Sequence, residues 1–450
     1  TVTGTSYSDT ALTTDNCYRW RIVTRDWHDQ TATSGDGNIV RRDATAPTAG
    51  APNYAAANIT GSSYSVTWSA GSDAASGIKN YDVERASSPY SAGACTGFGG
   101  YGYVTTVTGT SYSDTALTTD NCYRWRIVTR DWHDQTATSG DGNIVRRDAT
   151  APTAGSPNYA AAAINASSYS VTWSAGSDAG SGVKNYDVQR ASAAYTAGSC
   201  GSFGAYGNVG TALAGSPFSD TGLTTDNCYR WRIITRDWHD QTATSGDGNI
   251  VQRDATAPTA TGAVTPANTQ YGSYVDTPFD LSTTFSDAGS GVSSCQYTKD
   301  GSAWNAATWG AGTCSASSIT CTDGASLTLN MRANDTATNT GTATSVSLTC
   351  DANPPTTSIS PNGGSYSNDV PFTLTCTDAR SGCQITYYKI VDSTATCDKS
   401  GMSIGTSGTV TCPSGGYCQK KVCFYSKDNL NNEEACLLYT SDAADEEDSV

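Results

Sequence analysis

The stretch LTTDNCYRWRIV, residues 117–128, ends in a run in which apolar and charged side chains alternate. Tyr123, Trp125 and Ile127 occupy every second position of this run, and arginines stand between them. Successive side chains of a strand point to opposite faces of a sheet, so this period of two predicts a half-buried β-strand. No segment of the chain shows a convincing helical period, and the sequence therefore predicts an all-β protein.

The stretch belongs to a long internal repeat. Residues 1–50 recur letter for letter as residues 106–155, and a diverged third copy places Cys228 where Cys122 stands. The period is about 105 residues, which is the size of a whole β-sandwich module rather than of a solenoid unit. We therefore expect a tandem array of β-sandwich modules in an elongated rod.

The leucine and tyrosine of the quoted stretch, Leu117 and Tyr123, resemble the L-x5-Y signature of fibronectin type III modules. In that family the leucine precedes the sixth strand, and the tyrosine that opens the strand forms a tyrosine corner. The pair occurs again as Leu12 with Tyr18 and as Leu223 with Tyr229. The resemblance covers roughly residues 1–254, and it implies a fold rather than an activity.

The rest of the chain resembles bacterial and archaeal immunoglobulin-like surface domains. The resemblance is carried by the strings SDAGSG and TDARSG at 286–291 and 377–382, by a tyrosine ten residues after the aspartate of each string, and by the late loops ANDTATN and SKDNLNN. It implies immunoglobulin-like sandwiches that lack the leucine and tyrosine of the first pattern.

The strings D-A-T-A-P and D-A-N-P-P mark the expected module boundaries. The sequence predicts the second half of a fibronectin type III-like module at 1–43, complete modules of that kind at 44–148 and 149–254, an immunoglobulin-like module at 255–351, and a disulfide-rich one at 352–435.

Neither end of the chain is expected to be a natural terminus. Thr1 begins in the middle of the repeat. Residues 436–450, CLLYTSDAADEEDSV, resemble a translated sequencing adapter, and we expect them to form a non-native or disordered tail.

The sixteen cysteines are shared out so that every complete module has an even number. Even counts predict disulfides within modules and therefore an oxidising, extracellular or cell-surface location. The modules at 44–148 and 149–254 have two cysteines each, so the partner is fixed. The last module has six cysteines, which allow fifteen connectivities, and there the immunoglobulin resemblance implies one of the pairs. The predicted disulfides are Cys95–Cys122, Cys200–Cys228 and Cys376–Cys423.

The composition excludes several classes of function. The net charge of -16 makes nucleic acid an unexpected partner, and no run of the fragment approaches 18 apolar residues, so no membrane span is expected. The sequence has no nucleophile elbow, no H-E-x-x-H and no phosphate-cradling glycine loop, so we expect no catalytic residues and no enzyme activity.

Three aspartates recur around each module boundary: one in the linker, one in the loop after the second strand, and one after the sixth strand. In this type of sandwich these positions lie at the same end of a module, so the three should converge at each of four junctions. The four sets are Asp43, Asp73 and Asp131; Asp148, Asp178 and Asp237; Asp254, Asp287 and Asp335; and Asp351, Asp378 and Asp428.

Three converging carboxylates repel one another unless they are protonated or bridged, and calcium takes six to eight oxygen ligands. We therefore hypothesise that Ca²⁺ is the one possible cofactor and that it binds at the junctions. The alternative is that each aspartate only caps the backbone of its own turn, as loop aspartates often do.

The loop string RDWHDQ occurs three times, with a tryptophan and a histidine side by side. An exposed ring on a loop could stack on a sugar or on a partner surface. The favoured expectation is that the tryptophan covers the neighbouring module, because large apolar rings tend to be buried, and that the histidine is solvated. The residues are Trp27, Trp132 and Trp238, followed by His28, His133 and His239.

The sequence leaves three functions open. The first is a non-catalytic adhesin stalk or spacer on a cell surface, whose partner is a protein or glycan on another surface. The second is a set of accessory modules in a larger secreted hydrolase, since fibronectin-type modules commonly flank glycosidase domains. The third is carbohydrate binding through the RDWHDQ loops.

Overall fold

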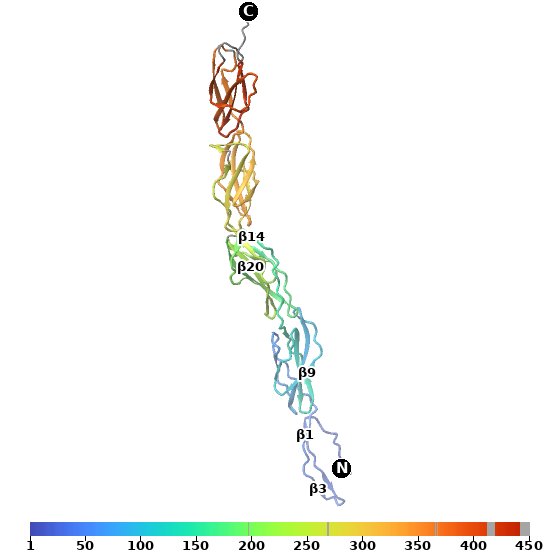
Figure 1. Ribbon diagram of the computed structural model, residues 1–450. Helices are drawn as coiled ribbons and strands as arrows, with labels where there is room; N and C mark the ends of the chain where they lie inside the picture. Colours follow the sequence, from blue (N-terminus) through green and yellow to red (C-terminus); the bar gives the residue numbers. More distant parts are fainter. Residues whose placement is uncertain (197, 268–269, 365, 367, 412–418, 442–450) are drawn as a thin grey trace, which may run out of the picture.

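The computed structural model describes residues 1–450 except 197, 268–269, 365, 367, 412–418 and 442–450. The chain forms an elongated rod in which the parts follow one another in sequence order (Figure 1). The elements of the described residues are all β-strands, so the all-β prediction is confirmed. No helix among the described residues is long and apolar enough to cross a membrane.

The first 43 residues form two short strand pairs. β1 (Asn16–Tyr18) pairs with β4 (Val40–Arg42), and β2 (Val23–Arg25) pairs with β3 (Thr31–Thr33). Trp20 is 37% exposed here, whereas Trp125, at the same place in an identical stretch of sequence, is 0% exposed. The same residues therefore form a core only when a second sheet packs against them.

The second module is a two-layer sandwich. The smaller sheet pairs β6 (Tyr64–Thr67) with β10 (Ser111–Asp114), and a bridge from Pro52 to Trp68 extends it. The larger sheet has the order β5-β13-β11-β7, with β9 also on β7. Its strands are β5 (Ala57–Ile59), β7 (Ile78–Ser91), β8 (Ala94–Cys95), β9 (Gly102–Val107), β11 (Asn121–Asp131), β12 (Thr136–Thr138) and β13 (Val145–Arg147). β11, which has Tyr123 near its start, is a central strand of this sheet, and the fibronectin type III resemblance is confirmed.

The third module repeats this order with its own strands. They are β14 (Ala162–Ile164), β15 (Tyr169–Val171), β16 (Val183–Thr196), β17 (Ser199–Cys200), β18 (Gly207–Leu213), β19 (Phe218–Asp220), β20 (Asn227–Asp237), β21 (Thr242–Thr244) and β22 (Val251–Arg253).

In the fourth module the two layers are joined into one continuous sheet, because β29 pairs with both β28 and β30. The strands are β23 (Thr259–Ala260), β24 (Thr265–Ala267), β25 (Gln270–Tyr271), β26 (Tyr274–Val275), β27 (Phe279–Ser286), β28 (Val292–Thr298), β29 (Asn305–Gly310), β30 (Thr313–Ile319), β31 (Ser326–Asp335), β32 (Thr340–Thr342) and β33 (Val346–Cys350).

The fifth module has two separate sheets, β34-β35-β38 and β37-β36-β39-β40. Its strands are β34 (Thr356–Ser360), β35 (Val370–Thr377), β36 (Cys383–Asp392), β37 (Ser403–Ile404), β38 (Ser407–Val410), β39 (Lys420–Asp428) and β40 (Leu437–Ser441). β40 lies in the segment predicted to be a non-native or disordered tail, and at its positions the chain forms a strand instead of being disordered. It does so by pairing antiparallel with the edge of β39.

The core of the second module is built around Trp125. Its ring lies edge-on to Tyr54, with 5.5 Å between centroids, and its indole N–H donates to Asp114 at 2.9 Å. Asp114 is completely buried and also accepts from the Arg85 guanidinium at 3.0 Å. The third module repeats this arrangement with Trp231, Asp220 and Arg190.

The tyrosine corner has the expected geometry in each complete fibronectin-like module. In the third module the Tyr229 hydroxyl accepts from the Thr224 amide at 2.7 Å and donates to the Thr224 carbonyl at 3.0 Å. Tyr229→Phe removes both bonds from a site that is 2% exposed. We expect a loss of about 1 kcal/mol, seen as a calorimetric transition lowered by about 4–8 °C. An unchanged thermogram would show that the corner contributes nothing to stability.

Six disulfides are present among the described residues. Two are those predicted, Cys95–Cys122 and Cys200–Cys228. Two more close the fourth module, Cys295–Cys314 and Cys321–Cys350. Cys17 and Cys436 are free.

The predicted pair Cys376–Cys423 is wrong. Cys376 bonds to Cys383, and Cys423 bonds to Cys397. Cys376 and Cys383 are only seven residues apart and flank the turn between β35 and β36, so the turn itself brings their Cα atoms to 6.2 Å. The other two cysteines of this module, Cys412 and Cys418, lie outside the described residues.

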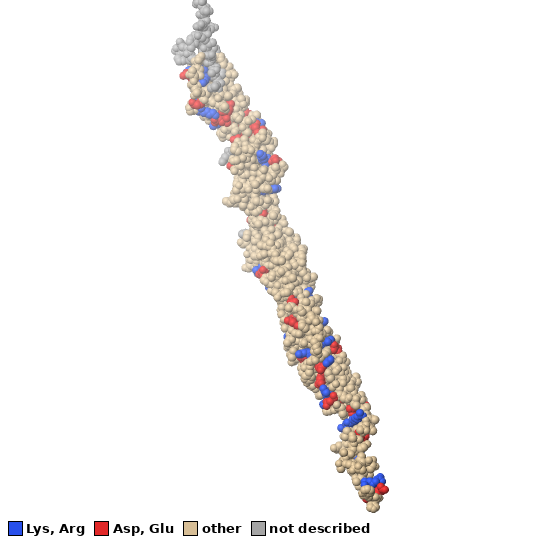
Figure 2. All heavy atoms as spheres, turned by 90° about the vertical axis from the view of Figure 1, so that its right-hand side faces the viewer, with Lys and Arg blue, Asp and Glu red and all other residues tan. Residues whose placement is uncertain are grey.

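Charged side chains lie in small scattered groups on the face shown in Figure 2, and most of that face is uncharged. On the larger sheet of the second module they form cross-strand pairs. Arg126 is 2.6 Å from Glu84, and Arg130 is 3.1 Å from Asp82. Such partly exposed pairs contribute about 0–1 kcal/mol each, so they fix register more than they add stability.

Candidate metal centres at the module junctions

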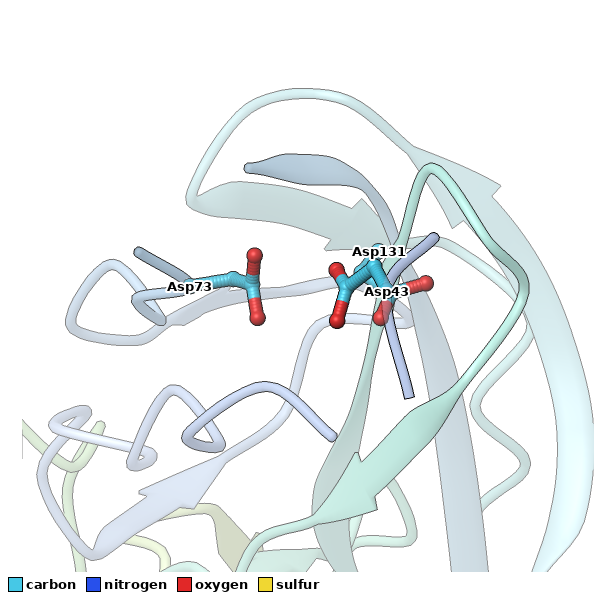
Figure 3. Close-up of side chains that lie close together, drawn as sticks. All are labelled: Asp43, Asp73 and Asp131. Atoms are coloured by element: carbon cyan, nitrogen blue, oxygen red, sulfur yellow. The ribbon is translucent and has the colours of Figure 1, made fainter. Parts of the chain in front are cut away.

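The structure brings the three predicted aspartates together at each of the four junctions. Within each set, one carboxylate oxygen from each residue lies within 4.8 Å of the others. Figure 3 shows the first set, in which the carboxylate of Asp73 faces those of Asp43 and Asp131. The linker after β4, the loop between β6 and β7, and the end of β11 supply these three residues.

These aspartates are buried to an extent that is unusual for loop carboxylates. Asp131, Asp148, Asp237 and Asp254 are 0% exposed, and the fourth junction matches them. The most deeply buried aspartates are those of the linker and those at the end of the sixth strand. The residues of the loop after the second strand are half-buried at each junction.

One oxygen of each carboxylate caps the backbone, as the alternative interpretation holds. Asp131 Oδ1 accepts from the amides of His133 and Gln135 at 2.7 and 2.9 Å. Asp73 Oδ1 accepts from Ser76 and Gly77 at 2.7 and 2.8 Å. Capping therefore explains how the loops are shaped.

Capping does not explain the second oxygens. In each set at least one carboxylate oxygen is buried and accepts no hydrogen bond from any described residue, although buried polar atoms are nearly always paired. These atoms are Asp43 Oδ2, Asp131 Oδ2, Asp178 Oδ2, Asp237 Oδ2, Asp287 Oδ2 and Asp351 Oδ1.

At the second junction, burial, hydrogen bonds and neighbouring charges shift the pKa values of two of the three aspartates. Burial, followed by the charges of Asp148 and Asp237, raises the pKa of Asp178 above its usual value. Burial also acts to raise the pKa of Asp148, but hydrogen bonds from Thr150 and Ser181 outweigh it, so that pKa is lowered. The third junction repeats the pattern, because burial and the charges of Asp254 and Asp335 raise the pKa of Asp287.

Sequence reasoning missed a fourth carboxylate, which the preceding module supplies. Asp120 lies in the loop before β11 with a φ of 56°. A side-chain carbon at Gly180 would come within 2.8 Å of Asp120 Oδ1 and 2.7 Å of Asp148 Oδ2, so only glycine lets both carboxylates approach this loop. Burial raises the pKa of Asp120. The hydrogen bond from Thr119 acts against this effect, and the charges of Asp148 and Asp178 add to it.

A carboxylate of the fourth module also interacts electrostatically with the aspartates of the fourth junction. Burial raises the pKa of Asp276, and the negative charges of Asp428 and Asp351 add to the effect. The repeated string TTDN, which contains Asp15, Asp120 and Asp226, was the available signal for such a residue in the fibronectin-like modules.

A side-chain amide after the last aspartate ties the linker to the module at every junction. Gln241 donates to the carbonyls of Asp148 and Thr150, each at 3.2 Å. Asn339 donates to the Asp254 carbonyl at 3.0 Å, and Asn432 donates to that of Asp351 at 3.1 Å. At the first junction Gln135 donates to the Thr45 carbonyl at 3.3 Å.

The second and third modules also touch directly. The tip of the hairpin between β7 and β8 donates two backbone hydrogen bonds, from Ala92 to the Ala179 carbonyl at 3.3 Å and from Gly93 to the Gly180 carbonyl at 3.1 Å. The disulfide from Cys95 holds this hairpin onto the start of β11. Backbone hydrogen bonds therefore join the second module directly to the third.

Two of the histidines face the junctions, and the expectation that they are solvated loop residues is wrong for the half-buried His239, whereas His133 is exposed. His239 packs edge-on against Tyr90 of the preceding module at 5.7 Å, and its Nε2 is 3.3 Å from the Arg146 carbonyl. His133 lies 3.3 Å from the Arg41 carbonyl in the same way. His28, in the incomplete first module, is exposed.

The favoured expectation that the tryptophans are buried is also wrong. Trp27, Trp132 and Trp238 are 102%, 63% and 54% exposed. The tight turn from Asp131 to Gln135 has one side toward the neighbouring module, and the histidine takes that side, so the ring next to it points to solvent. The Lys184 amine lies 5.8 Å from the Trp238 ring centroid.

Comparison with known proteins adds context to this architecture. No family model matches the chain. The chain is 28% identical to Exoglucanase B of Cellulomonas fimi over 248 residues, which are 53% of this chain and 20% of the exoglucanase. It is 39% identical to Chitinase C of Streptomyces lividans over 103 residues, which are 23% of this chain and 14% of the chitinase. It is 37% identical to Chitinase 63 of Streptomyces plicatus over 125 residues, which are 28% of this chain and 17% of that enzyme.

The chain thus spans a fifth or less of the length of these relatives. The second and third modules have a fibronectin type III-like fold. Two solved structures with fibronectin modules also match: the FN1–FN3 domains of chicken CNTN1, at 14% identity and a TM-score of 0.25, and the fibronectin(III)-like modules of Clostridium thermocellum CbhA, at 12% identity and 0.24. The match with CNTN1 covers 68% of this chain and 98% of the CNTN1 chain. The match with CbhA covers 40% of this chain and 92% of the CbhA chain.

Proposed function

We propose that the chain is a rigid, non-catalytic spacer that works outside the cytosol. The observation that supports it best is the bonded junction, where backbone hydrogen bonds and a linker-holding amide join one module to the next. Linkers this short cannot behave as flexible coils. The six disulfides of the described residues support an oxidising compartment.

Within this role we favour accessory modules of a larger secreted enzyme that degrades a polysaccharide. The support is the sequence similarity to stretches of an exoglucanase and of two chitinases. A cell-surface adhesin stalk would use the same rod, and it remains the competing proposal. Sequencing the complete gene would separate them, because the enzyme proposal requires a catalytic domain on the same chain.

Small-angle X-ray scattering of the full chain tests the spacer itself. We expect the scattering of an extended rod both in EDTA and with calcium, because the interlocking bonds that set the mean orientation of the modules do not involve an ion. A six-residue Gly-Ser insertion after Thr150 should bend the rod at the second junction. The matched control places the same insertion after Gly109, in an exposed loop within a module. Scattering typical of beads on a flexible string would contradict the proposal.

A second candidate function is weak glycan binding by the exposed tryptophans, and their exposure of 54% or more favours it. Affinity electrophoresis in gels that contain soluble cellulose or chitin derivatives tests this candidate. If the rings bind sugars, the chain should be retarded, and Trp132→Ala combined with Trp238→Ala should abolish most of the retardation without changing the thermal transitions. Equal migration with and without polysaccharide would remove this candidate.

A further inference from the structure

We propose that each junction binds one calcium ion, and that the ion is shared between two consecutive modules. This inference deepens the spacer function, and it depends on that function only for its mechanical consequence. The site consists of the three aspartates of each set. At the second junction, Asp120 of the preceding module also approaches the loop of Gly180 that Asp148 contacts.

The buried unpaired oxygens are the first reason to place a cation here. Asp237 is 0% exposed, and its Oδ1 caps the loop while its Oδ2 has no partner among the described residues. Asp131 Oδ2 and Asp351 Oδ1 repeat this state at the first and fourth junctions, and at the third junction the Oδ2 atom of the half-buried Asp287 is also buried without a partner. An ion between the carboxylates gives these atoms the partner that the protein does not supply.

The second reason is a contrast within the same modules. Asp114 and Asp220 are also buried carboxylates, and each has an arginine at about 3 Å. Among the described residues no lysine or arginine forms an ion pair with any aspartate of the four sets, and the imidazole nitrogen Nδ1 of His133 lies 3.9 Å from Asp43 Oδ2. Buried charges are normally paired or bound to a metal, so the sets lack a positive charge.

The donor set selects calcium. All the candidate ligand atoms are carboxylate oxygens, which are hard ligands, and the cysteines of the complete modules that the structure describes are held in disulfides. At the third and fourth junctions the position of the histidine is taken by Ala337 and Leu430, so no imidazole is offered there. Loops from separate modules form a flexible cage, which suits Ca²⁺ better than the strict octahedron of Mg²⁺. Water completes the six to eight ligands.

Isothermal titration of the full chain, stripped with EDTA and then titrated with CaCl₂, tests the proposal. We expect four equivalents of calcium per chain, one for each set, and a rise of several degrees in the thermal transitions. Asp237→Asn keeps the Oδ1 that caps the loop but removes the charge, and it should bind three equivalents. Asp240→Asn is the matched control, because Asp240 lies in the same loop but pairs with Lys184 at the surface, and it should bind four.

The stability of the variant separates a metal ligand from a structural residue. In EDTA, Asp237→Asn should melt at or above the temperature of the wild-type chain, because it removes like-charge repulsion. In calcium it should melt below the wild type. The absence of calcium uptake, or four equivalents in Asp237→Asn, would overturn the proposal. If the chain takes up no calcium but scatters as a rod in EDTA, the proposal of a bound ion would be overturned, whereas the proposed spacer function would stand.

Discussion

Replacing Asp114 by alanine will abolish or nearly abolish the stability of the second module, at a cost of about 3–5 kcal/mol. The Asp114 carboxylate is completely buried, and it accepts from the Arg85 guanidinium and the Trp125 indole. Its removal leaves a partly buried positive charge and a buried N–H without partners, which costs far more than the lost contacts. Differential scanning calorimetry should show one transition lost or strongly lowered.

The third module is an internal reference for this variant, because Asp220 makes the same contacts there and is unchanged. Asp134→Asn provides a second control. Asp134 pairs with Lys79 at the surface, with its side chain 62% exposed, and asparagine tolerates its φ of 64°, so the thermogram should stay as it is. If Asp114→Ala shifted the melting of the second module no more than Asp134→Asn, the role assigned to the buried pair would be wrong.

Removing the disulfide of the second module, by Cys95→Ser together with Cys122→Ser, should cost about 3–4 kcal/mol. The bond closes a loop with a sequence separation of 27, and chain-entropy arguments give this magnitude for such a loop. The free hairpin tip should also loosen from the third module, because Ala92 and Gly93 on this hairpin make the backbone contacts to it.

Hydrogen exchange with mass spectrometry measures both effects of the double substitution. We expect faster exchange throughout the second module and at the hairpin tip, with the third module protected by Cys200–Cys228. Cys17→Ser is the control, because Cys17 is free and exposed. Unchanged protection of the second module in the double variant would show that its core holds the fold without the bond.

The fold of the two fibronectin-like modules could be predicted from one stretch of sequence, because the period-two run and the tyrosine corner are local features. Trp125 and Ile127 are buried as that run indicates. The convergence of the aspartates followed from topology alone, since the sandwich fixes which loops share an end. These features need no knowledge of side-chain contacts.

The rest depended on tertiary contacts. Asp120 reaches the junction only because its loop adopts a positive φ and because Gly180 leaves room across the module boundary. The exposure of Trp132 depends on which residue of a tight turn faces the preceding module, and the alternation of apolar and polar residues does not decide this. The pairing of Cys376 with Cys383 depends on the shape of one turn, whereas family resemblance pointed to a more distant partner.

The claim that calcium-binding junctions hold neighbouring modules in fixed orientations is tested most directly by a distance distribution across one junction. Spin labels that do not use thiols, placed at the exposed positions Thr108 and Ala214 of the full chain, allow pulsed electron resonance without disturbing the disulfides. With calcium we expect one narrow distance distribution, and with EDTA a broader one around a similar mean. A broad distribution in calcium would contradict the account.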